Sequence, residues 1–248
     1  MIVPERPRTF RRRAGPAALA GVIGVVHVAA ALAGASGLAT VPTADIVPRH
    51  GVTFQFQNGN TSLREDPKLW SRLLPVIQTQ FGLAPSLEAG VDLVPVDSPG
   101  DYRPQCNVKW RPLEEDYDWP AIAGGITQIG SGQDAAGYLL VTRTLNYREI
   151  RNRIFRAHHR NIKLRGRRLH AGVFRQRGRS FPLLGAEFEL SDHVVLVGDW
   201  IGGAGRTLDA GATFVFNESS SLGVFAVRGN DSGRVDGVLF SFTHTITW

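Results

Sequence analysis

The chain contains a single cysteine, Cys106, among its 248 residues. One thiol cannot form a disulfide within the chain, so the fold must be stabilised by its own packing and hydrogen bonding. Long disordered or low-complexity tracts are also lacking. Hydrophobic residues make up 43% of the chain, which excludes a bundle of transmembrane helices but not a β-barrel, whose strands are apolar on one face only.

The N-terminal stretch differs from the rest of the chain. Five arginines between Arg6 and Arg13 precede an uncharged run rich in Ala and Val at residues 14–32. Small-x-small cleavage patterns follow at residues 31–33 and 33–35. This order is typical of a secretory signal peptide, so we predict a cleaved signal at residues 1–35. An uncleaved membrane anchor is the alternative, because the apolar run is nearly long enough to span a bilayer.

The last stretch of the chain, residues 236–248, alternates strictly between two kinds of side chain. Period-two alternation places these two sets on opposite faces of one strand. One face is mostly aromatic and aliphatic, and the other is mostly hydroxyl-bearing. The apolar set is Val238, Phe240, Phe242, His244, Ile246 and Trp248, and the other set is Leu239, Ser241, Thr243, Thr245 and Thr247.

An alternating last strand that ends on an aromatic residue resembles the assembly signal of bacterial outer-membrane β-barrels. The resemblance implies an outer-membrane location, lipid around the barrel, and recognition of the C-terminal strand by the barrel assembly machinery. Residues 36–50 form a Pro-punctuated, extended lead-in, and their Pro-Thr-Ala-Asp sequence at 42–45 is similar to the opening of porin-like barrels associated with exopolysaccharide export.

Segments of strand length recur along residues 51–248, and an even number of antiparallel strands is typical of single-chain bacterial barrels. We therefore predict an all-β, up-and-down transmembrane barrel of about twelve strands. We expect the short turns at 83–86, 191–193 and 217–221 to lie on one side of the membrane. The predicted strands are 52–57, 74–82, 87–93, 105–111, 119–129, 137–145, 168–175, 183–190, 194–201, 208–216, 222–228 and 238–248.

Charges alternate with apolar residues in several of these segments. Glu88 and Asp92 share one face of their strand, and Lys109 and Arg111 share one face of the next. Unpaired charges in a dry sandwich core would be costly, so this pattern favours a wet lumen with paired charges. The candidate lumen-lining residues are Glu88, Asp92, Lys109, Arg111, Arg168, His170, Glu187, Glu189, Asp199 and Asp209.

Residues 146–167 interrupt the strand pattern with a basic insertion. Its apolar residues have helical spacing, which favours a short amphipathic helix. The cations could bind an anionic partner such as lipid headgroups, lipid A phosphates or an acidic polysaccharide; a solvated connection without a ligand is the alternative. Nucleic acid is not an expected partner of an exported barrel. The anion-binding candidates are Arg148, Arg151, Arg153, Arg156, Arg160, Lys163 and Arg165.

Catalytic patterns are weak throughout. His244 resembles the start of a deacylase-like His-x-Ser pattern, but Ile246 stands where the serine would be needed. His158 and His159 lack further metal ligands, and Gly202–Gly205 reads as a turn. We therefore predict no enzyme activity, metal or cofactor, and a passive role as a porin-like channel or as an envelope scaffold in polysaccharide or lipid traffic. The alternatives are a soluble secreted β-sandwich or barrel that binds an anionic ligand, and an envelope lipase or deacylase.

Overall fold

The structure is a computed structural model and describes residues 37–58, 61–62, 75–95, 101–130, 135–145, 167–203, 206–230 and 237–248. The predicted signal peptide and nearly all of the basic insertion lie outside these residues. Within the described ranges, no helix is long and apolar enough to cross a membrane.

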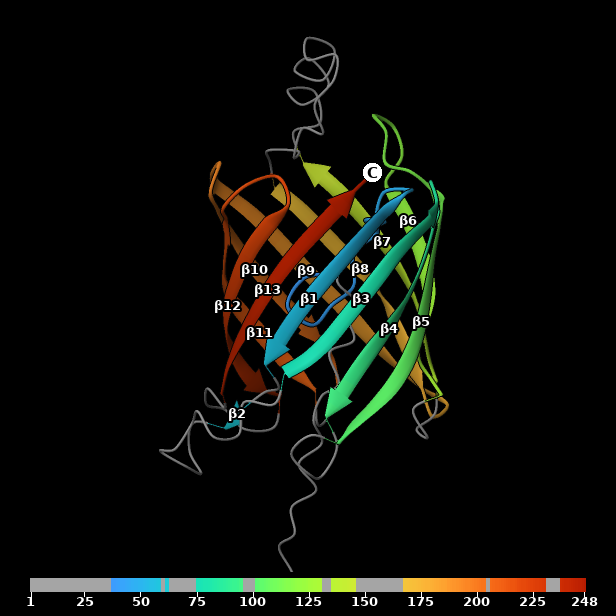
Figure 1. Ribbon diagram of the computed structural model, residues 1–248, viewed down its shortest axis with the longest axis vertical. Coiled ribbons are helices and arrows are strands. Elements are labelled where there is room, and N and C mark those ends of the chain that lie inside the picture. The colour runs from blue at the N-terminus through green and yellow to red at the C-terminus, as the bar shows by residue number, and fades with distance from the viewer. Residues whose placement is uncertain are drawn as a thin grey trace, which may run out of the picture.

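Twelve long strands and one two-residue strand form a single antiparallel sheet. Each long strand pairs with the next one along the chain, as an up-and-down meander requires (Figure 1). The strands are β1 (Gly51–Asn58), β2 (Thr61–Ser62), β3 (Pro75–Ala84), β4 (Leu87–Pro95), β5 (Tyr102–Leu113), β6 (Ala121–Ile129), β7 (Ala136–Leu145), β8 (Arg167–Gln176), β9 (Arg179–Ser191), β10 (Val194–Ile201), β11 (Thr207–Val215), β12 (Ser220–Gly229) and β13 (Gly237–Thr247).

The sheet closes into a barrel because the first and last long strands pair. Strand β1 runs antiparallel to β13, from the pair Gly51–Thr247 to the pair Gln57–Ser241. Closure removes the exposed sheet edges that an open sandwich would leave. The predicted fold, a closed barrel of twelve antiparallel strands, is therefore confirmed. The short strand β2 adds two residues beside the start of β13 and was not predicted.

The barrel has two open ends, which we name by the chain. The C-terminal mouth is the end where β1 begins and β13 finishes, and the far mouth is the opposite end. Antiparallel order places the short turns after β3, β9 and β11 at the C-terminal mouth, as predicted. The basic insertion joins β7 to β8, whose pair Leu145–Arg167 lies at the C-terminal mouth as well.

Alternation along the strands divides side chains between the outside and the inside of the barrel. The outside is apolar: Leu169, Leu184 and Leu190, for example, are 48%, 49% and 58% exposed. The inside is largely polar, with Gln80, Thr142 and Asp209 fully buried. The apolar outside differs from the surface of a water-soluble barrel, which is largely polar.

Large aromatic side chains gather near the C-terminal mouth. Trp110 pairs with the first residue of β4, Trp119 lies in the connection before β6, and Trp248 ends the chain. All three are more than half exposed, as is Phe216. In membrane barrels, aromatic residues form such a girdle at the boundary between hydrocarbon and headgroups.

Candidate functional site

Residues 37–50, here called the inner segment, lie inside the barrel (Figure 1). Its apolar residues Leu38, Ala39, Val41, Ala44 and Val47 are all buried. A tight turn starts it, with a bridge between Gly37 and Pro42 and a hydrogen bond from Leu38 N to Val41 O of 2.8 Å. The sequence predicted an extended lead-in here, but nothing in its pattern indicated that it occupies the lumen.

The inner segment is bound to strands on different sides of the barrel. Its backbone amides donate to side chains of the wall: Ala44 N to Thr142 Oγ1 of β7 at 3.1 Å, and Val47 N to Glu88 Oε2 of β4 at 2.7 Å. In return, the side chain of Gln57 in β1 donates to the carbonyl of Ala39 at 2.8 Å. A segment without regular secondary structure thereby satisfies its buried backbone groups through lumen side chains.

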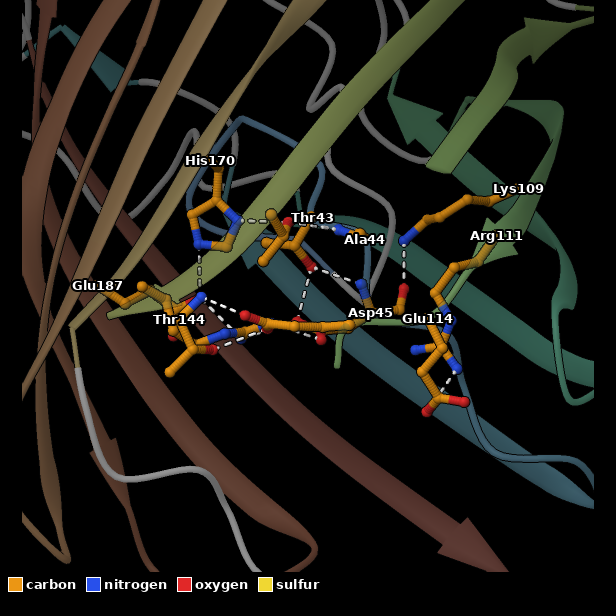
Figure 2. Close-up of polar contacts among 12 residues, drawn as sticks. Thr43, Ala44, Asp45, Lys109, Arg111, Glu114, Thr144, His170 and Glu187 are labelled. Atoms are coloured by element: carbon orange, nitrogen blue, oxygen red, sulfur yellow. Dashed lines mark hydrogen bonds and ion pairs between the residues drawn. The ribbon is translucent and has the colours of Figure 1, made fainter. Parts of the chain in front are cut away.

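Asp45 is the centre of an ionic network near the C-terminal mouth (Figure 2). Both of its carboxylate oxygens accept from the Arg168 guanidinium, at 2.7 and 3.0 Å. Arg168 also donates to Glu187 at 3.2 Å, and the same Glu187 oxygen lies 3.0 Å from Nε2 of His170. The His170 ring is held on its other side by Thr142, 2.9 Å from Nδ1. Strands β7, β8 and β9 are thus linked to the inner segment.

The charge of Arg168 determines the ionisation of Asp45. Removal from bulk water by itself would raise the pKa of this carboxyl, but the adjacent guanidinium outweighs that effect and holds the pKa of Asp45 well below its usual range. Asp45 is therefore an anion under all ordinary conditions, and the fork-to-carboxylate geometry is that of a strong, orientation-specific pair.

A second ion pair lies between β4 and β5. Lys109 Nζ is 3.0 Å from Glu88 Oε1, and the two side chains are only 4% and 2% exposed. Lys109 also donates to the backbone carbonyl of Asp45 at 2.8 Å, while Glu88 accepts from Val47 N. This buried pair therefore binds the inner segment through both of its members, and Figure 2 shows the contact made by Lys109.

Thr40 is held by two carboxyl groups that face each other across β10 and β11. Asp199 and Asp209 are opposite one another in the strand register, and both are buried. Thr40 Oγ1 lies 2.9 Å from Asp199 Oδ1 and 2.6 Å from Asp209 Oδ2, and Thr40 N donates to Asp199 Oδ2 at 3.0 Å. Since a hydroxyl has one proton to donate, one of these contacts requires a protonated carboxyl. The two aspartates thus hold Thr40 from two neighbouring strands.

Part of the lumen is apolar, which the sequence did not lead us to expect. Phe174, Leu183, Phe225 and Val227 face inward and are almost completely buried. They form one core with residues 38, 39 and 41 of the inner segment, together with Ala136, Val197, Ile201 and Leu239. The interior is thus a packed core around the inner segment, with the ion pairs of Asp45 and Lys109 toward the C-terminal mouth and the carboxyl groups of Asp199 and Asp209 beside the apolar core.

The structure places the ten predicted lumen residues as follows. Arg111 lies toward the C-terminal mouth and pairs with Glu114 at 3.3 Å. Two groups of these residues bind the inner segment, either directly or through one other side chain. They are the network of Arg168, His170 and Glu187 and the pair of Asp199 and Asp209. Buried residues are Glu88, Asp92, Lys109, His170, Asp199 and Asp209, and half-buried ones are Arg111, Arg168, Glu187 and Glu189.

Sequence analysis did not identify several interior residues that bind the wall or the inner segment. Asp45 and Thr40 stand in a segment without periodicity, so no local signal marks them as partners of residues more than a hundred positions away. Glu115 follows β5 and accepts from Thr144 Oγ1 at 2.8 Å, and here too the partner is distant in sequence. The glutamines of β1 and β3 could have been found from alternation, because Gln55 and Gln57 oppose the aromatic face of their strand.

The other residues that the sequence singled out lie outside the lumen or outside the described residues. The seven anion-binding candidates and the pair His158–His159 lie outside the described residues. His244 faces outward, and its Nδ1 is 2.9 Å from Ser220 Oγ on the neighbouring strand. In the described part of the chain, no cluster of three or more His, Cys, Asp or Glu residues could hold a metal ion.

Comparison with models of known protein families found no match to this chain. Comparison with curated proteins found none either.

Proposed function

We propose that this chain is an outer-membrane β-barrel that serves as a closed scaffold of the cell envelope rather than as an open porin. The observation that carries the proposal is the distribution of side chains: large apolar residues cover the outside, while the charges lie inside and bind the inner segment. An apolar exterior of this extent would promote association in water, but it is the surface that a bilayer requires.

The filled lumen favours a scaffold over a channel. An open porin needs a water-filled passage, whereas here the inner segment is hydrogen-bonded to β1, β4, β5, β7, β8, β10 and β11. Its apolar residues pack against the inward-facing residues of the wall. These contacts support a permanent occupant of the lumen.

Three partners follow from this proposal. Lipid would surround the apolar exterior, and the barrel assembly machinery would recognise β13 with its terminal Trp248. An anionic lipid or polysaccharide at the basic insertion would link the scaffold to polysaccharide or lipid traffic in the envelope.

The first test is a gel comparison of boiled and unboiled envelope extracts. Closed membrane barrels resist SDS until they are heated and then migrate differently, so we expect a mobility shift and recovery in the outer-membrane fraction. Release into the soluble periplasm without detergent, with no shift, would contradict the membrane proposal and favour the soluble ligand-binding alternative.

The second test is conductance in planar bilayers, which separates the scaffold from the porin. The wild type should show no steady openings. A variant with Thr40→Val and Asp45→Ala, which removes two anchors of the inner segment, should open intermittently, whereas Arg49→Gln, at an exposed position of the same segment, should behave as the wild type does. Steady wild-type openings would support a porin-like channel instead. Lipid ester hydrolysis that is lost in His244→Ala would support the lipase alternative.

A further inference from the structure

Two buried carboxyl groups lie side by side near the far mouth. Asp199 is two residues before the end of β10, Asp209 is two residues after the start of β11, and they are 2% and 0% exposed. The flanking strands present no charge to them, because Gly185 of β9 lies opposite Asp199 and the buried Val227 of β12 lies opposite Asp209. Two carboxylates in so dry a place would repel each other strongly.

The charged groups on the neighbouring elements are engaged with other partners. Glu187 on β9 and His170 on β8 bind each other, and Glu187 also accepts from Arg168. Arg206, which precedes β11, donates to Gln176 at 2.9 Å. Among the described residues, neither aspartate has a Lys, Arg or His partner. A bound proton neutralises the pair without requiring any other side chain.

The hydrogen bonds assign the charge to Asp199 and the proton to Asp209. Asp199 has three donors, which are Thr40 N at 3.0 Å, Thr40 Oγ1 at 2.9 Å and Val41 N at 3.3 Å. Several donors to one carboxyl stabilise its charged form. Asp209 accepts from Thr207 Oγ1 at 3.2 Å, and its buried Oδ1 has no hydrogen-bond partner among the described residues. Such an oxygen costs less as the carbonyl of a neutral acid than as part of an anion.

Thr40 links the two carboxyls in one direction. A protonated Asp209 donates from Oδ2 to Thr40 Oγ1, 2.6 Å away, and Thr40 Oγ1 then donates to Asp199 Oδ1. Loss of the proton removes the first of these bonds and places a second negative charge opposite Asp199. The hold of β10 and β11 on the inner segment therefore depends on the proton.

We propose that Asp209 is a proton-binding site that fastens the far-mouth half of the inner segment to β10 and β11. The attachment weakens as the pH rises, in contrast to that of the anionic Asp45 toward the other mouth. The site rests on the fold alone and not on the membrane location proposed above.

The sign of the pH dependence follows from the number of bound protons. An aspartate of the unfolded chain loses its proton at about pH 3.9, whereas Asp209 of the folded chain keeps its proton to higher pH. The folding equilibrium constant should therefore fall about tenfold for each pH unit between these two titrations and become level above the second.

The test compares the wild type with Asp209→Asn, whose amide can donate to Thr40 at every pH. Urea unfolding of both full chains in detergent is followed by gel mobility between pH 5 and pH 9. Relative to Asp209→Asn, the folding constant of the wild type should fall about tenfold per pH unit until the proton dissociates. Glu218→Gln, which removes an exposed carboxyl at the C-terminal mouth, should follow the wild type at every pH.

Amide hydrogen exchange locates the effect in the inner segment. At pH 9, residues 38–44 should exchange roughly tenfold faster in the wild type than in Asp209→Asn, while the strands exchange equally. The wild type alone gives the same information if the variant does not fold. Its residues 38–44, corrected for the intrinsic effect of pH, should exchange faster at pH 9 than at pH 6, and β4 should not.

Three results would overturn the proposal. Parallel stability curves for the wild type and Asp209→Asn would show that Asp209 binds no proton in the folded chain. Equal effects of Asp199→Asn and Asp209→Asn would contradict the assignment of the proton to Asp209, since Asp199→Asn should destabilise the barrel at every pH. Stabilisation of the wild type by millimolar Ca²⁺ at pH 6, absent in Asp209→Asn, would identify a metal ion in place of the proton. Because these measurements need no bilayer, they decide the site whether or not the barrel spans a membrane.

Discussion

At the scale of single residues, the interior depends on charges that are satisfied by partners from distant parts of the chain. Glu88 and Lys109 illustrate the energetics, because both are almost completely buried and each also binds the inner segment. A buried ion pair contributes little net stability compared with apolar residues of the same size, but removal of one member leaves an uncompensated charge.

Lys109→Met should therefore lower the free energy of unfolding by about 3–5 kcal/mol, since Glu88 would be left buried without its cation. The double variant Glu88→Gln, Lys109→Met should recover a large part of that loss. Urea unfolding in detergent, followed by gel mobility, measures both. If the double variant were less stable than Lys109→Met, the uncompensated charge of Glu88 would not be the cause of the loss.

Asp45 should make the attachment of the inner segment sensitive to acid. Its pKa is depressed in the folded state, so its contribution to stability is fully present above its unfolded pKa of about 3.9 and is lost as the pH falls further toward its folded pKa. The wild type should thus lose stability progressively below about pH 4, apart from the contributions of other carboxyls.

Asp45→Asn should remove that part of the acid dependence and cost about 1 kcal/mol at pH 7, a modest value because the carboxyl is half exposed. Thermal midpoints of both proteins between pH 7 and pH 3 provide the measurement. Parallel curves for the two proteins over this range would show that Asp45 does not contribute.

At the scale of elements, the chain passes from the inner segment into β1 at a close backbone contact with β3. A Cβ atom at Gly82 of β3 would lie 1.9 Å from the carbonyl oxygen of Pro48 and 2.5 Å from that of Val47. The backbone of His50 also donates to Gly82 O at 3.3 Å. Only glycine leaves room for the chain to pass from the lumen into the wall at this position.

Gly82→Ala should displace residues 47–48 and destabilise the barrel by about 1–3 kcal/mol, as overpacking of a closed interior does. Gly137→Ala on β7 is the matched control, because its Cβ would have no atom closer than 3.9 Å, and its effect should stay within about 0.5 kcal/mol. Unfolding midpoints compare the two, and equal effects would mean that the contact at Gly82 is not limiting.

At the scale of the whole molecule, the outside of the barrel should be accessible to lipid and not to water. Cys106 is the sole thiol of the chain, and it faces outward on β5. It therefore reports on its surroundings without any substitution.

In lipid nanodiscs, Cys106 should react at least tenfold more slowly with a charged maleimide than with an apolar one, and heating in SDS should abolish the difference, because a charged reagent does not enter hydrocarbon. Mass spectrometry of the labelled protein gives both rates. Equal rates in the nanodisc would place Cys106 in water and contradict a lipid-facing β5.

The sequence predicted the wall of the barrel well, for a physical reason. Each strand carries its own alternation, so the outward Phe240 and Phe242 and the inward Ser241 can be assigned from neighbouring residues alone. Charged positions such as Glu88 and Lys109 were assigned to the lumen in the same way. The predicted residues that lie in the basic insertion remain predictions.

Sequence periodicity therefore predicts the features with a short repeat: the twelve long strands, their order and the apolar outward face. Only the tertiary structure decided what fills the barrel, because the pairs Asp45–Arg168 and Thr40–Asp199 join positions that no period relates. The inner segment has no alternation of its own, and its conformation follows from the closed wall around it. Curvature brings the inward faces of opposite strands together, and only then do Phe174 and Leu183 become a core for Leu38 and Val41.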